Sequence, residues 1–201
     1  MGEIISSSKL ARIISTTFVP PSFTIILITY FAFELEKTGL NKIIIISTAL
    51  TFGFLFHIIY FMRLRTKGKI SDNEASLKEE RDSPYLVAII FYIIGLAILI
   101  LTRVNILIIA YWLSNIPNTL VAFSINKKWK ISAHTLWVSG AFAAIIYLFG
   151  SMGLLFLPLI FIIGWSRFKL RLHTMAQILT GSLVGFCLTY LQIFLIVNFF
   201  A

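Results

Sequence analysis

The sequence has few charged residues and very few acidic ones. Charged side chains make up 12% of its 201 residues, and Asp and Glu together number only 8; soluble domains average about 25% charged residues. The aspartates are limited to Asp72 and Asp82, and no acidic residue follows Asp82. Prenyl transfer and alcohol phosphotransfer are therefore disfavoured, because both usually rely on Asp-rich, magnesium-binding motifs.

Cysteine is also scarce, whereas apolar residues are abundant. The single cysteine, Cys187, excludes an internal disulfide and is expected to be a small packing residue. Hydrophobic residues make up 59% of the chain, and its mean hydropathy is +0.95. Apolar runs of about 18 residues or more recur, and about 20 apolar residues cross a ~30 Å hydrocarbon core as a helix. The sequence therefore predicts an all-α, integral membrane protein with a single domain over residues 1–201.

The apolar runs predict a polytopic bundle of about seven transmembrane spans. The run Tyr85–Ile125 is too long for one helix and is divided at Thr102-Arg103, because a charged residue is disfavoured at mid-bilayer. The run His134–Trp165 is divided at Gly150-Ser151-Met152-Gly153, a turn signal. The remaining predicted spans are Ile14–Phe33, with Pro20-Pro21 near its start, Ile43–Met62 and Thr174–Phe200.

Most of the basic residues fall on one side of this predicted topology. The N-terminus, the polar loop 63–84 and the loops 126–133 and 166–173 hold fourteen of the seventeen Lys and Arg residues. The positive-inside rule makes this side cytoplasmic, and we expect a plasma-membrane location. The net charge of +9 favours a lipid phosphate as partner rather than nucleic acid, because little of the chain is soluble.

Two of the three histidines lie where a predicted span begins on the basic side. His134 and His173 open the fifth and seventh spans, where free backbone N–H groups and the helix dipole favour an anion. His57 lies within the second span and is expected to be a packing residue.

Basic side chains near these two histidines suggest phosphate chemistry. Arg167 offers a rigid fork of donors, Lys130 a point charge and Ser132 a further donor. Two histidines can divide the roles of nucleophile and acid in phosphoryl transfer. The alternative is that the basic residues are membrane anchors and the histidines are incidental.

The motif Ser166-Arg167-x5-His173 resembles the third signature of the type-2 phosphatidic acid phosphatase superfamily, which includes vanadium haloperoxidases. Ser132-Ala133-His134 resembles the Ser-Gly-His of its second signature, with Ile131 where the family usually has proline. For the first signature, Lys-x6-Arg-Pro, only the residue types of Lys78, Arg81 and Pro84 agree, and Glu74 stands seven residues before Arg81. The resemblance covers roughly residues 66–190.

The resemblance implies a six-helix phosphatase-like core and a metal-independent lipid phosphatase, with no metal site and no cofactor. His173 would attack phosphorus to form a phosphohistidine, and His134 would protonate the leaving oxygen. The phosphate oxygens would be held by Arg167, Lys78, Arg81, Lys130 and Ser132, with the 63–84 loop contributing to the site. Phosphatidic acid and a polyprenyl diphosphate are the implied substrates.

One departure from the family concerns Gln177, which stands where the family has an aspartate. A residue four positions after His173 lies on the same helix face. A glutamine there can orient the imidazole by a hydrogen bond but supplies no charge. Any substitute carboxylate must come from the first loop, where Glu74 is one of the five acidic residues. The alternatives are an active phosphatase and a non-catalytic protein that binds lipid phosphates; a transporter is disfavoured, because no charged residue lies securely within a span.

Two other features have alternative interpretations. Gly181 and Gly185 favour close helix packing over shaping a lipid groove. Asn115, Pro117 and Asn118 either cap a kink in the fourth span or line a cavity for the lipid chain, because polar groups at that depth need partners within the bundle.

Overall fold

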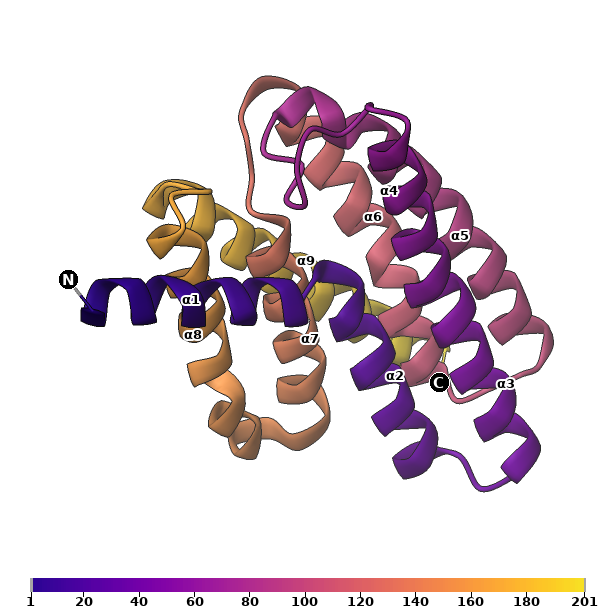
Figure 1. Cartoon of the computed structure of the whole chain (residues 1–201). Coiled ribbons are helices and arrows are strands. Elements are labelled where there is room, and N and C mark those ends of the chain that lie inside the picture. The colour runs from indigo at the N-terminus through magenta and orange to yellow at the C-terminus, as the bar shows by residue number, and fades with distance from the viewer. Residues whose placement is uncertain (1, 201) are drawn as a thin grey trace.

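The computed structural model describes the backbone of residues 2–200 and the side chains of residues 7–200. Every regular element in this range is a helix, which confirms the predicted all-α fold. The elements are α1 (Gly2–Thr17), α2 (Pro20–Leu35), α3 (Gly39–Leu50), the π-helical segment η1 (Thr51–Leu55), α4 (Phe56–Thr66), the 3₁₀ turn η2 (Lys78–Arg81), α5 (Asp82–Leu101), α6 (Ile106–Lys128), α7 (Ala133–Phe149), the 3₁₀ helix η3 (Gly150–Phe156), α8 (Leu157–Lys169) and α9 (Met175–Phe200) (Figure 1).

Five helical segments of the described chain are long and apolar enough to cross a membrane, and a sixth is added if α1 and α2 are counted as one bent span. The predicted number of seven treats α7 and α8 as separate spans, whereas residues Ala133–Lys169 form one continuous helical stretch of 37 residues. This stretch folds back on itself at η3, so that Gly164 of α8 lies near Thr135 at the start of α7. Figure 1 shows the two arms side by side.

The predicted first span, residues 14–33, is wrong at its beginning. Helix α1 ends at Thr17 and α2 begins at Pro20, and the two meet at 58°. Proline has no backbone N–H to donate and disfavours helical geometry in the residue before it. Val19 is accordingly extended, with φ −65° and ψ 153°. As a result, α1 runs across the bundle and packs against α8 (Figure 1).

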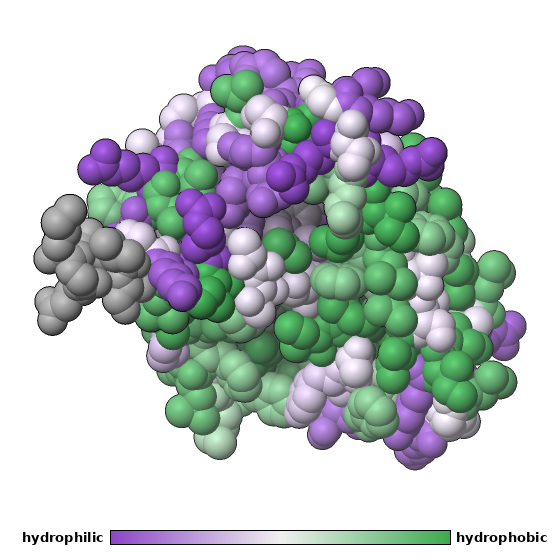
Figure 2. All heavy atoms as spheres, viewed as in Figure 1, coloured by the Kyte–Doolittle hydropathy of each residue, from purple (hydrophilic) through white to green (hydrophobic). Residues whose placement is uncertain are grey.

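Polar residues gather at one end of the bundle, where the loop between α4 and α5 lies (Figure 2). At this end Lys127 Nζ of α6 lies 2.6 Å from Asp82 Oδ2 of α5. Lys130 Nζ donates to the Leu172 carbonyl across 2.8 Å, which joins the loop before α7 to the loop before α9. Apolar side chains cover the flank of the bundle below (Figure 2). The basic loops named above therefore lie together, as the helix topology requires.

Helix α7 is the centre of the fold, and α9 packs closely against it through glycines. Every residue from His134 to Ala144 is buried. A Cβ atom built on Gly185 would lie 2.0 Å from the Leu136 carbonyl oxygen, and one on Gly181 would lie 2.6 Å from the Ser132 carbonyl oxygen. Both glycines therefore bring the two backbones into contact, and neither lines the cavity described below.

The asparagines of α6 join helices and do not line that cavity. Asn118 Nδ2 donates to Thr189 Oγ1 of α9 across 2.7 Å. Asn115 Nδ2 donates to the Tyr111 carbonyl of its own helix, and its Oδ1 accepts a bond from Thr24 of α2. Both side-chain amide nitrogens are thus paired inside the bundle, as is Oδ1 of Asn115, whereas the buried Oδ1 of Asn118 has no partner among the described residues.

Candidate anion-binding site

A cavity of about 350 Å³ lies below the polar end of the bundle, among α1, α4, α5, α7 and α8. Its polar lining includes Ser15, Glu74, Arg81, His134, Arg167 and His173. Its apolar wall includes Ile58, Phe61, Pro84, Tyr85, Ala88, Phe91, Tyr92 and Trp137. Arg81 directly precedes α5, and Tyr92 lies about three turns further along that helix. The cavity therefore runs from a cationic end near the basic loops to an apolar interior.

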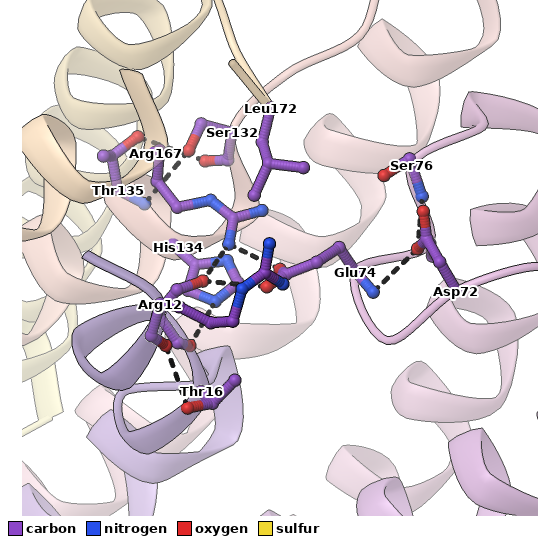
Figure 3. A network of polar contacts seen from close by, with 12 residues as sticks. Arg12, Thr16, Asp72, Glu74, Ser76, Ser132, His134, Thr135, Arg167 and Leu172 are labelled. Atoms are coloured by element: carbon purple, nitrogen blue, oxygen red, sulfur yellow. Dashed lines mark hydrogen bonds and ion pairs between the residues drawn. The ribbon is translucent and has the colours of Figure 1, made fainter. Parts of the chain in front are cut away.

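Arg167 is the most deeply buried cation of the site. Its side chain is 1% exposed and is held by the C-terminal turn of α8. Nη1 lies 2.5 Å from Glu74 Oε2 and also donates to Ser15 Oγ, while Ser15 Oγ donates to Glu74 Oε1 across 3.0 Å. Figure 3 shows Arg167 and Glu74 pointing toward each other. The buried Nε of Arg167 has no hydrogen-bond partner among the described residues, so one N–H group of the guanidinium is left unsatisfied.

His173 lies in the loop between α8 and α9, with its ring fixed by Gln177. The two contacting atoms, His173 Nδ1 and Gln177 Oε1, are 3.1 Å apart. The backbone N–H of Thr174 donates to the same Oε1, which identifies that atom as the amide oxygen. Nδ1 therefore carries the proton, and the lone pair of His173 is on Nε2. An imidazole in this tautomer is a competent nucleophile.

His134 lies in the first turn of α7 and also contacts the end of α1. Its Nε2 lies 3.3 Å from the carbonyl oxygen of Ser15. Because a carbonyl only accepts, Nε2 is the donor of this bond. The proton of His134 thus points at α1, and Ser15 contacts His134 through its backbone and Arg167 through its hydroxyl.

Arg81 connects the 63–84 loop to the start of α7. Its Nε donates to the Ala75 carbonyl across 2.8 Å, and its Nη1 donates to the Ile131 carbonyl across 3.0 Å. Only 7% of its surface is exposed, and it lines the cavity. Arg81 therefore positions the loop that carries Glu74 and also adds positive charge to the polar end.

Three other predicted residues do not line this cavity. Lys130 lines a second, open depression of about 750 Å³, which His173 and Gln177 also line. Ser132 is fully buried as the N-cap of α7, where its Oγ accepts from Thr135 N. Lys78 Nζ donates to the Lys127 carbonyl across 3.2 Å. The structure thus brings His134, His173, Arg167 and Arg81 together in one cavity, with Gln177 behind His173.

The electrostatics of the site disfavour protonation of His173. Burial, followed by the charges of Arg81, Arg167 and Lys130, lowers its pKa from 6.5 to about 2, although the bond to Gln177 acts in the opposite direction. Burial and the neighbouring Arg81 and Arg167 likewise lower the pKa of Lys130. His173 is therefore neutral at physiological pH, and an added negative charge would be stabilised here.

This lowered pKa predicts a loss of stability in acid. The unfolded chain takes up a proton at His173 below pH 6.5 and the folded chain does not until about pH 2, so stability falls as pH falls through this interval. Thermal unfolding in detergent at about pH 7 and about pH 5 should show a loss of about 2 kcal/mol from this group. His173→Gln should lose less stability over the same interval, and equal losses in both proteins would contradict the prediction.

Two functional candidates were not predicted in their observed roles. Ser15 was placed inside a predicted span, and no signal in the sequence connects it with Arg167. Glu74 was one of several possible substitute carboxylates for the aspartate replaced by Gln177. The structure instead places its carboxylate on Arg167, 2.5 Å from Nη1.

Comparison of the chain with protein-family models, with curated proteins and with solved structures finds no match. Its function is therefore inferred from the residues of the site. No group of three His, Cys, Asp or Glu side chains in the described part of the chain is arranged to hold a metal ion.

Proposed function

We propose that the chain is a membrane lipid phosphatase that acts through a phosphohistidine. The observation that carries the proposal is the position of His173. Its free Nε2, defined by the bond from Nδ1 to Gln177, belongs to a ring that lines the same cavity as Arg167 and Arg81. The rest of that cavity is lined mainly by apolar side chains. A phosphate on a hydrophobic tail has the shape and charge to fill both parts.

In the proposed reaction, His173 Nε2 attacks phosphorus while Arg167 and Arg81 stabilise the charge on the nonbridging oxygens. The bond from phosphorus to the lipid oxygen, or to the leaving phosphate of a diphosphate, breaks. His134, in its imidazolium form, supplies the proton to the leaving oxygen and takes a proton back from the water that later attacks the phosphohistidine. Water hydrolyses the phosphohistidine, which releases phosphate and restores His173.

The open depression beside His173 supports a route for water and phosphate. It is lined by Ser8, Lys130, Lys169, Arg171 and Thr174, together with apolar residues of the α8–α9 loop. His173 lines both this depression and the apolar cavity. A lipid can therefore approach from one side of the imidazole and water from the other. The basic loops favour the cytoplasmic face of the plasma membrane as the location of the site.

The test is phosphate release by the purified full chain in detergent. Phosphatidic acid and a polyprenyl diphosphate are compared side by side, each with and without a chelator. We expect release from at least one of the two lipids, unchanged by the chelator, and the faster substrate defines the class. Release that requires added divalent metal, or no release from either lipid, would contradict the proposal.

One observation favours the alternative, a protein that binds lipid phosphates without hydrolysing them. Glu74 occupies Arg167, and Gln177 adds no negative charge to stabilise a protonated or phosphorylated His173. Lipid binding without phosphate release in the same preparation would support this second function.

A further inference from the structure

The contact between Glu74 and Arg167 resembles the contact that a bound phosphate would make. The carboxylate places one oxygen on Arg167 Nη1 and the other on Ser15 Oγ. Its side chain is 9% exposed, so it lies within the site. A phosphate has the same need for charged donors at short distance.

The site nevertheless has unused capacity for an anion. Arg167 makes both of its hydrogen bonds through Nη1, while its buried Nε has no partner. A guanidinium binds phosphate best through two N–H groups at once. Glu74 and Ser15 therefore accept only some of the hydrogen bonds that Arg167 can donate. An anion that also accepts a bond from a second N–H group would bind Arg167 more strongly than Glu74 does.

A carboxylate and a phosphate cannot both lie against one guanidinium without repelling each other.

The segment that carries Glu74 is built to hold it in place. Asp72 Oδ1 accepts bonds from the backbone N–H groups of Glu74 and Ser76, at 2.8 and 3.1 Å. Ala75 has a positive φ of 44°, an unfavourable conformation for alanine, and its carbonyl is held by Arg81. The Glu74 backbone is therefore locally strained on one side and fixed on the other.

From these contacts we infer that Glu74 is an internal competitor for the anion site. Glu74 and Ser15 close the site when it is empty, and the incoming phosphate displaces the carboxylate from Arg167. Movement of Ser15 also frees the Nε2 proton of His134, which its carbonyl holds. This inference rests on the proposed function in one respect, since both place phosphate oxygens at Arg167.

The test is binding of inorganic phosphate to the full chain in detergent, measured by isothermal titration calorimetry. Glu74→Gln keeps the shape of the side chain and removes its charge. The matched control is Glu79→Gln, which removes the same charge from the same segment at a side chain that is 71% exposed. We expect Glu74→Gln to lower the Kd about tenfold or more, because like charges at one site oppose binding strongly. Glu79→Gln should change it by less than about twofold, because exposed charges are screened.

An unchanged or weaker affinity in Glu74→Gln would overturn the inference, and so would an equal gain in Glu79→Gln. Should Glu74→Gln fail to fold, Ser15→Ala removes the hydroxyl that holds the carboxylate, and phosphate binding should again tighten. An unchanged Kd in Ser15→Ala would then overturn the inference.

Phosphate release from lipid by the same variants separates this inference from the proposed function. If Glu74→Gln binds phosphate more tightly but neither the wild type nor any variant hydrolyses lipid, the inference about Glu74 is supported and the phosphatase proposal is contradicted. If the wild type hydrolyses lipid but Glu74→Gln binds phosphate no more tightly, the phosphatase proposal is supported and the inference about Glu74 is contradicted.

Discussion

His173→Ala is expected to reduce phosphate release from lipid by at least about a thousandfold, because it removes the only atom that would form the covalent intermediate. The Nε2 lone pair of His173 is fixed by the bond from Nδ1 to Gln177. The other histidine of the pair, His134, donates its Nε2 proton to the Ser15 carbonyl, so its Nε2 has no lone pair for attack on phosphorus. The measurement is the initial rate in detergent with chelator present.

Two further variants serve as comparisons: Lys78→Ala is a control, and Gln177→Asp tests the role of charge beside His173. Lys78→Ala removes a cation whose Nζ bonds the Lys127 carbonyl and which does not line the cavity, so activity should stay within about twofold, as for a screened surface charge. Gln177→Asp should raise the rate, because a carboxylate stabilises the charged imidazole that forms on phosphorylation. A His173→Ala protein that folds normally and keeps more than about a tenth of the activity would exclude the phosphohistidine.

Gly185→Ala is expected to have the largest effect on folding. The added Cβ would lie 2.0 Å from the Leu136 carbonyl oxygen and 2.8 Å from its carbonyl carbon. Leu136 lies in the buried first turn of α7, and its backbone atoms cannot move aside without disrupting that turn. Helix α9 must therefore separate from α7 and lose the packing between them. We expect a loss of more than about 3 kcal/mol, at the upper end of the range for overpacking.

The measurement is thermal unfolding in detergent, with Gly39→Ala as the matched control. A Cβ on Gly39 meets nothing within 4 Å, so this variant should unfold within about 0.5 kcal/mol of the wild type. Because α9 begins just after His173, any Gly185→Ala protein that does fold should also have lower activity. Equal stability of the two variants would mean that α7 and α9 are not packed as described.

The features that were predictable from the sequence depend on local chemistry. The charge on Arg103 predicted the break between α5, which ends at Leu101, and α6, which begins at Ile106. The small residues Gly181 and Gly185 predicted a close helix contact, which the structure shows between α9 and α7. In each case the prediction depends on one residue type and concerns the structure within a few residues of it: a charge disfavours an unbroken span, and a glycine permits close helix packing.

The features that were not predictable depend on contacts between distant parts of the chain. Ser15 reaches Arg167 over a separation of 152 residues, and it does so because the break at Pro20 turns α1 across the bundle. Glu74 reaches Arg167 because Arg81 and Asp72 fold the loop inward. Nothing in the spacing of Lys78 showed that it would bond the Lys127 carbonyl instead of lining the cavity.

The contact between α7 and α9 fixes the spacing of His134 and His173 independently of the 63–84 loop. Ser132 N–H donates to the Gln177 carbonyl across 3.4 Å, and Thr135 Oγ1 donates to the Ile178 carbonyl across 3.1 Å. These bonds tie the first turns of the two helices together next to His134 and His173. Arg81 and Glu74, in contrast, belong to a segment outside this helix pair. In the proposed lipid phosphatase, mutations between residues 67 and 81 are therefore expected to alter which headgroup is accepted while the spacing of the two histidines is preserved. Relatives with other lipid preferences should then differ in this segment first.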